Sequence, residues 1–181
     1  MAKAWEREYP RDRFNEEHYN LLVRRAGALS SGDFILLGGW KDRAGTDKQW
    51  RFNVASVAYP AWIDASRELP DIRVEQLSVE RFLREWADHR YPDTSSRSGD
   101  GKKRFGLSRA TTLLHFMSAG AFPIYDSRVR RAVKRLCNEG APDNVDWYRK
   151  SYIPIFHDLL TACSASARHL DKALFGYGYR P

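Results

Sequence analysis

The sequence predicts an all-α fold, a compact domain of several helices, on two observations. Apolar residues recur at spacings of three and four along most of the longer segments, as they do on one face of a helix. The strict alternation of polar and apolar residues that marks a half-buried strand has little support. Hydrophobic residues make up 43% of the 181 residues, which is enough for a packed core and excludes a globally disordered chain.

The first half of the chain is expected to contain helices over about residues 15–29, 61–69 and 78–89. Ser78 begins the last of these, because a serine hydroxyl can accept a backbone N–H of the first helical turn. The segment 34–40 is ambiguous between helix and strand, and 52–59 is unassigned. Residues 41–48 are expected to form a loop.

Residues 92–101 form the clearest loop, because Pro, Gly, Ser and Asp dominate them. This loop divides the chain into an N-terminal helical part, 1–91, and a C-terminal part, 102–181. We expect the two parts to pack as one compact unit.

The second half of the chain carries the strongest pattern. Residues 107–119 are apolar on nearly all sides, which predicts a central buried helix. Pro123 forbids helix in the link that follows, so 122–125 should be extended. Asp126 then caps a helix that is apolar on one face and basic on the others. Further helices are expected after residue 142, with a kink or restart at Pro154, and over 166–175.

Neither a membrane span nor a secretory signal is readable. No apolar run approaches the roughly 20 residues that cross a bilayer, and residues 1–13 are charged. We therefore expect a cytoplasmic protein. Cys137 and Cys163 have no neighbours at metal-binding spacing, so reduced core thiols are expected, with neither a metal nor an organic cofactor.

The positive charge is concentrated in one segment. The net charge is +7. The segment from Arg97 to Arg135 contains ten lysines and arginines but only two aspartates, so the rest of the chain has a slightly negative net charge. Such a localised excess favours a polyanion, and duplex DNA is the expected partner. Gly106 precedes the buried helix, whose first amides can dock a phosphate. The residues expected to contact DNA are Lys102, Lys103, Arg104, Gly106, Ser108, Arg109, Arg128 and Arg131.

Asp126 stands between an apolar segment and five cations of the following helix, a setting that could keep it ionised. A carboxylate beside bound DNA can stabilise positive charge on a sugar whose glycosidic bond is breaking, and can orient a water for attack. An aspartate at this position also has a purely structural role as a helix cap.

Residues 105–114, FGLSRATTLL, and 122–129, FPIYDSRV, resemble the core of helix-hairpin-helix DNA glycosylases, in the branch with the 8-oxoguanine glycosylase fold. The resemblance covers about residues 103–136. It implies that Gly106 belongs to a phosphate-binding hairpin and that Asp126 is the catalytic carboxylate. The implied activity is excision of a modified or damaged base, in repair or in defence against foreign DNA.

Two departures from that family pattern shape the prediction. Its hairpin carries two glycines, whereas only Gly106 is present here. Its bifunctional members carry a lysine about eighteen residues before the aspartate, where this chain has Ser108 followed by Arg109. We therefore predict a monofunctional glycosylase that uses water and does not cleave the strand.

A glycosylase must hold its flipped base in an aromatic or apolar pocket. The expected pocket residues are Tyr125, Trp40 and Trp147. His115, on the buried helix, is expected to be a core histidine. Two other functions fit the sequence: a non-catalytic DNA-binding module on the same scaffold, and a protein-interaction domain whose basic face meets an acidic partner.

Overall fold

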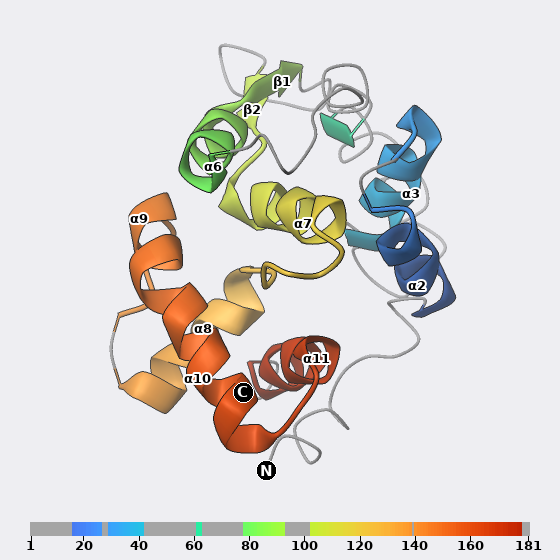
Figure 1. Cartoon of the computed structure of the whole chain (residues 1–181). Coiled ribbons are helices and arrows are strands. Elements are labelled where there is room, and N and C mark those ends of the chain that lie inside the picture. Colours follow the sequence, from blue (N-terminus) through green and yellow to red (C-terminus); the bar gives the residue numbers. More distant parts are fainter. Residues whose placement is uncertain are drawn as a thin grey trace, which may run out of the picture.

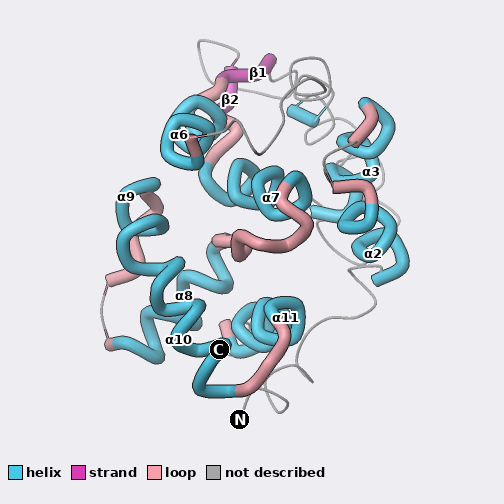
Figure 2. Tube along the Cα trace, viewed as in Figure 1, coloured by secondary structure: helices cyan, strands magenta, loops and turns pink. Residues whose placement is uncertain are grey.

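The computed structural model describes residues 16–26, 29–41, 61–62, 78–92, 102–138 and 140–178. In these ranges the regular secondary structure is helical apart from one short strand pair, so the all-α prediction is confirmed (Figures 1 and 2). The helices are α2 (Glu16–Arg24), α3 (Ser31–Lys41), α6 (Val79–Asp88), α7 (Leu107–Met117), α8 (Ser127–Cys137), α9 (Val145–Trp147), a π-helical turn η3 (Tyr148–Tyr152), α10 (Ile153–Cys163) and α11 (Ala167–Tyr177). None of the helices so described is long and apolar enough to cross a membrane.

Helix α7 is the centre of the fold, as its apolar pattern predicts. Nine of its eleven residues are buried. Figure 1 shows it between α6 on one side and the α2–α3 pair on the other. The buried side chains form one cluster that reaches from Tyr19 to Phe175, so residues on both sides of the expected 92–101 loop share a core.

The ambiguous segment 34–40 is helical and lies within α3. Gly38 is needed there, because a Cβ at this position would lie 2.5 Å from the Trp62 indole. The helices expected at 15–29 and 78–89 are present with shorter ends, and the Ser78 hydroxyl accepts the Arg81 N–H as predicted. The segments 42–60 and 63–77 lie outside the described residues.

One strand pair corrects the expectation that strands are absent. Strands β1 (Arg90–Pro92) and β2 (Lys102–Arg104) are antiparallel, with Arg90 opposite Arg104. Three-residue strands rich in cations and proline show no apolar alternation, so the periodicity gave no signal. The pair lies between α6 and α7 in the chain, where the resemblance implies a hairpin. Residues 93–101 of the expected loop lie outside the described residues.

Helices α9, α10 and α11 and the turn η3 follow α8 along the chain. Helix α11 packs on α8, and the predicted irregularity at Pro154 is the π-helical turn η3, which directly precedes α10. Proline lacks an N–H and crowds the carbonyl four residues earlier, which a widened turn relieves. Cys163 is exposed and Cys137 is only partly buried, so the expectation of core thiols is wrong, although the two form no disulfide.

Candidate functional site

The extended link before α8 is fixed by hydrogen bonds from its surroundings. The Tyr148 hydroxyl donates to the Pro123 carbonyl at 2.8 Å, and the Tyr152 hydroxyl donates to the Ile124 carbonyl at 3.4 Å. Burial raises the pKa of both tyrosines, so both hydroxyls keep the proton that they donate. The turn η3 therefore fixes the link, and the link in turn positions Asp126.

Helix α7 fixes the same link from the other side. The Thr111 hydroxyl accepts the Tyr125 N–H at 3.1 Å, and His115 Nδ1 lies 2.6 Å from the Phe122 carbonyl. A carbonyl only accepts, so Nδ1 carries the proton and Nε2 accepts from the Tyr19 hydroxyl at 2.9 Å. Burial lowers the pKa of His115, which keeps it neutral. The prediction of a core histidine is confirmed.

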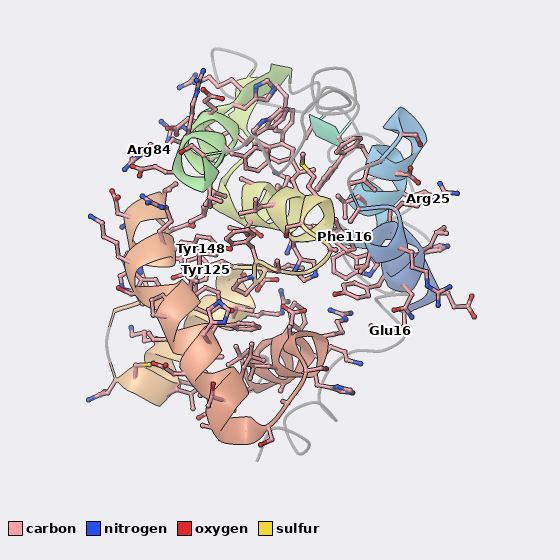
Figure 3. The ribbon with its side chains drawn as sticks, viewed as in Figure 1. Glu16, Arg25, Arg84, Phe116, Tyr125 and Tyr148 are labelled. Carbon is pink, nitrogen blue, oxygen red and sulfur yellow. The ribbon has the colours of Figure 1, made fainter. Side chains whose placement is uncertain are left out.

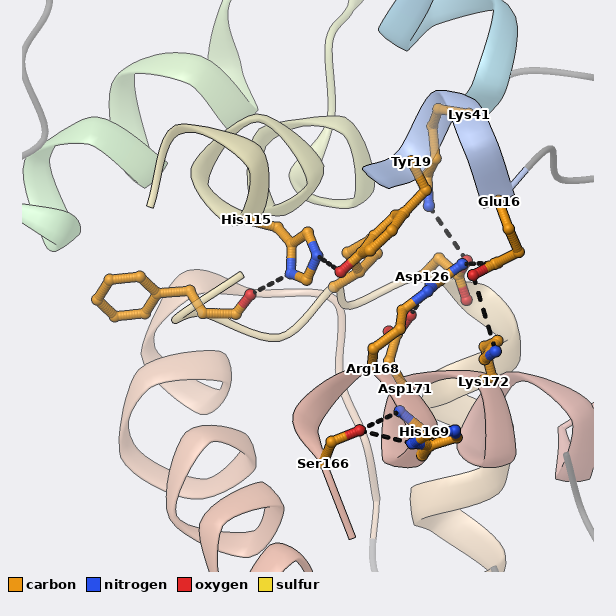
Figure 4. A network of polar contacts seen from close by, with 12 residues as sticks. Glu16, Tyr19, Lys41, His115, Asp126, Ser166, Arg168, His169, Asp171 and Lys172 are labelled. Carbon is orange, nitrogen blue, oxygen red and sulfur yellow. Dashed lines mark hydrogen bonds and ion pairs between the residues drawn. The ribbon is translucent and has the colours of Figure 1, made fainter. Parts of the chain in front are cut away.

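Asp126 caps α8, as predicted, and both of its carboxylate oxygens are bound. Oδ1 accepts the backbone N–H groups of Arg128 and Val129, each at 3.0 Å. Oδ2 accepts from Lys41 Nζ at 3.1 Å, the ion pair drawn in Figure 4. Asp126 is 9% exposed, so this is an ion pair in a mostly dry setting.

The charge state of Asp126 follows from opposing effects. Burial acts to raise its pKa, but the Lys41 ammonium and the amide hydrogen bonds from Val129 and Arg128 outweigh burial and lower the pKa below its ordinary value. The carboxylate is therefore ionised at neutral pH. The sequence correctly predicts an ionised aspartate, but assigns the cause to cations of α8 instead of to Lys41.

Lys41 is the ion-pair partner of Asp126, and the sequence alone did not predict it. It is the last residue of α3, and its side chain is 9% exposed. In the sequence, Lys41 stands at the start of an expected loop, where a lysine is normally solvated. Its partner lies 85 residues further along the chain, a separation that no local pattern encodes.

A small cavity adjoins Asp126. Its volume is about 20 Å³, and its walls include Trp40, Lys41, Phe175 and the Arg168–Asp171 pair. This volume suits a single water molecule beside polar groups. It is far below the several hundred Å³ of a ligand pocket, so the site is closed to a nucleobase in this conformation.

Charged residues of α11 and α2 brace this cavity. Arg168 pairs with Asp171 at 2.7 Å and with Glu16, and its guanidinium lies 3.8 Å from the centre of the Tyr19 ring. Lys172 also approaches Glu16, at 3.7 Å. Figure 4 shows these groups gathered beside the Lys41–Asp126 pair. Elements from both ends of the described chain therefore meet at Asp126.

The three aromatic residues predicted to hold a base are not brought together in one pocket. Tyr125 is fully buried and donates its hydroxyl to the Pro142 carbonyl, so it lies in the core (Figure 3). Trp40 lines the cavity at Asp126. Trp147 stacks on Tyr125, with ring centres 5.5 Å apart, and lines a different hollow. Of the three, only Trp40 stands beside the carboxylate.

That second hollow is a groove on the outer face of α8. Its volume is about 730 Å³, within the range of ligand sites. Helix α8 contributes Ser127, Arg130, Arg131 and Lys134, and the segment 140–142 and Trp147 form the other wall. It shares no wall residue with the cavity at Asp126.

The predicted DNA contacts near the start of α7 differ in accessibility. Gly106 caps α7 with φ +83°, a conformation that favours glycine, and no side chain caps the first turn. Arg104 is exposed and pairs with Asp88 at 3.3 Å. Arg109 is half-buried, and its guanidinium donates to the Phe105 carbonyl. Ser108 is half-buried in the first turn.

The remaining predicted contacts lie on β2 and α8. Lys102 and Lys103 belong to β2. Arg128 is half-buried, with its guanidinium 5.4 Å from the centre of the Phe175 ring, and Arg131 is exposed. Asp126, which is buried, therefore lies deeper than Arg128 and Arg131.

Within the described residues, no three His, Cys, Asp or Glu side chains gather as a metal site would require. Comparisons of the chain with protein-family models, with curated proteins and with solved structures find no match.

Proposed function

We propose that this protein is a DNA glycosylase that hydrolyses the N-glycosidic bond of a modified or damaged base. The observation that carries the proposal is the Asp126 carboxylate. It is ionised, fixed by two backbone amides and set beside a cavity with room for one water. The resemblance of residues 103–136 to helix-hairpin-helix glycosylases supports the same assignment.

The chemistry needs one carboxylate and one water. As the glycosidic bond breaks, its electron pair leaves with the base and positive charge develops on the sugar, which the carboxylate stabilises. The water oxygen then bonds to C1′ of the sugar, and one of its protons passes to the departing base. Asp126 orients that water, and base release leaves the strand intact.

The substrate requires more room than the closed site provides. A flipped base needs a pocket of roughly several hundred Å³. Trp40 and Lys41 of α3 and Phe175 of α11 form the walls beside Asp126. We propose that α3 and α11 separate when DNA binds, so that Trp40 contacts the flipped base.

Lys41 raises the question of amine chemistry, because a lysine attached to C1′ would permit strand cleavage. As an ammonium paired with Asp126, Lys41 has no lone pair for that attack. The proposal is therefore hydrolysis by water, with Lys41 as a positioning residue. Reduction of an enzyme–substrate mixture with borohydride should trap no covalent adduct. An adduct that forms with wild type and is lost in Lys41→Gln would contradict monofunctional hydrolysis.

The start of α7 supports DNA as the substrate. Its first-turn amides have no side-chain cap, and the exposed Arg104 lies two residues before Gly106. A phosphate can accept from such amides while nearby cations reduce its charge.

A screen of modified duplexes tests the proposal. Purified wild type and Asp126→Asn would be incubated with duplexes that carry oxidised, deaminated, alkylated, hydroxymethylated or glucosylated bases, and abasic sites would be revealed by alkali. Release by wild type only supports the proposal. The second candidate is a non-catalytic DNA-binding module, which the closed cavity favours; it predicts duplex binding by both proteins and release by neither.

A further inference from the structure

The groove on the outer face of α8 is separate from the cavity at Asp126. We infer that it binds a nucleotide unit of a single polynucleotide strand, with the phosphate on Arg131 and Lys134 and the base against Trp147. This inference goes beyond the proposed base release and does not depend on it. The groove has a volume of about 730 Å³.

The charge of the groove selects an anion. Arg130, Arg131 and Lys134 of α8 line the groove, with Lys134 four residues after Arg130 and three after Arg131, and no acidic side chain is among the wall residues. Arg130 is already held by Asp143 at 3.0 Å and by the Ala141 carbonyl. Arg131 and Lys134 are exposed and form no ion pair with any residue that the structure describes. These two cations are therefore available to a phosphate.

The opposite wall supplies an aromatic platform. Trp147 stacks on Tyr125 and lies nearly parallel to Tyr152, at 13°. Tyr125 is in turn anchored by its hydrogen bond to Pro142, itself a wall residue. An indole braced in this way loses little freedom when a base stacks on it. Aromatic stacking beside phosphate-binding cations is the arrangement by which proteins hold unpaired strands.

The groove and the cavity at Asp126 lie on different sides of α8. Val129 faces the cavity with Asp126, whereas Ser127, Arg130, Arg131 and Lys134 face the groove. Duplex DNA stacks its bases inward, so its bases cannot reach a side-on platform such as Trp147. An unpaired strand can, which is why the groove favours a single strand.

Binding of short labelled oligonucleotides, measured by fluorescence anisotropy, tests the inference. Thymidine and uridine oligonucleotides would distinguish DNA from RNA as the source of the strand. The groove variant is Arg131→Ala with Lys134→Ala, and its control is Arg24→Ala with Arg81→Ala, which removes the same charge from exposed sites on α2 and α6. Trp147→Leu removes the platform, Trp147→Phe keeps a ring, and thermal unfolding checks that each variant folds.

The groove variant and Trp147→Leu should each weaken binding of at least one oligonucleotide about tenfold, while the control and Trp147→Phe stay within about twofold of wild type. Equal weakening by the groove and control variants would overturn the inference, since overall charge would then explain binding. Competition by polyglutamate as strong as by an oligonucleotide, with no effect of Trp147→Leu, would assign the groove to an acidic polypeptide instead. Asp126→Asn should bind the oligonucleotides like wild type, whatever the base-release screen finds.

Discussion

At Asp126, a single carboxylate combines the roles of helix cap, ion-pair partner and candidate catalyst. Asp126→Asn keeps an oxygen for the α8 amides but leaves the Lys41 ammonium without its partner in a mostly buried place. Breaking such a pair costs about 3 kcal/mol. We expect that loss in the free energy of unfolding at neutral pH.

The pH dependence of this loss has a defined direction. The pKa of Asp126 in the folded protein is below its ordinary value. The ionised carboxylate therefore contributes its full stabilisation of the fold above the unfolded pKa of about 4, and this contribution is lost as the pH falls through the folded pKa. Denaturant unfolding of wild type and Asp126→Asn at neutral and strongly acidic pH measures it. The two proteins should converge in acid, and a difference independent of pH would contradict the ion pair.

Gly178 shows how tightly α11 meets α8. Its φ of −72° suits any residue, but a Cβ there would lie 1.9 Å from the Arg128 carbonyl oxygen. Gly178→Ala should therefore destabilise the protein by about 1–3 kcal/mol through overpacking. Gly140→Ala is the control, because its Cβ would meet no atom within 4 Å. Equal unfolding midpoints for the two variants would show that this contact is not rigid.

At the scale of elements, α7 acts on Asp126 through Thr111. Thr111 and Thr112 are both fully buried, but the Thr111 hydroxyl accepts the Tyr125 N–H from the link, whereas Thr112 bonds only within α7. Thr111→Val leaves a buried N–H unsatisfied, which costs about 1–3 kcal/mol.

Thr112→Val removes a hydroxyl of the same size without freeing the link. Comparing the two variants by chemical unfolding and by base release isolates the contribution of the link to the site. We expect Thr111→Val to lose more stability and more activity per folded molecule. If Thr112→Val is equally impaired, α7 does not hold Asp126 through this bond.

The sequence predicts this part of the fold well because the signals are local. Pro123 enforces the extended link, and Asp126 has the residue type and position of a helix cap. Lys41 and the β1–β2 pair were missed for a physical reason. A lysine at a helix end is expected to be solvated, and only the tertiary fold places a carboxylate beside Lys41. Strands of three residues are too short to show a periodic pattern.

At the scale of the whole molecule, the fold separates the charged surface from the carboxylate. Asp126 lies in the interior, whereas Arg104 and Arg131 are exposed. Tyr125 illustrates what the sequence leaves open, because its position next to Asp126 suggests a pocket residue, yet its ring turns into the core. Which way a side chain turns depends on tertiary packing, and one chain's periodicity does not fix it.

Duplex binding should depend steeply on salt. Each phosphate contact contributes a slope of about −0.9 to log K against log salt concentration. Arg104→Ala removes one expected phosphate contact and should therefore make the slope less negative by about 0.9. Arg81→Ala, on α6, removes an equal charge outside the basic segment and should leave the slope unchanged. A wild-type slope near zero would exclude phosphate contacts as the basis of binding.

We propose that Asp126 acts in the release of a base from DNA. Its most direct measurement is the single-turnover rate of base release by wild type and Asp126→Asn on the same panel of modified duplexes, with duplex affinity measured for both. We predict that wild type releases at least one base, that the rate of release falls about 100-fold or more in the variant, and that the two proteins bind the duplex with similar affinities. Release at equal rates by both proteins, or binding without release by wild type on every duplex, would contradict it.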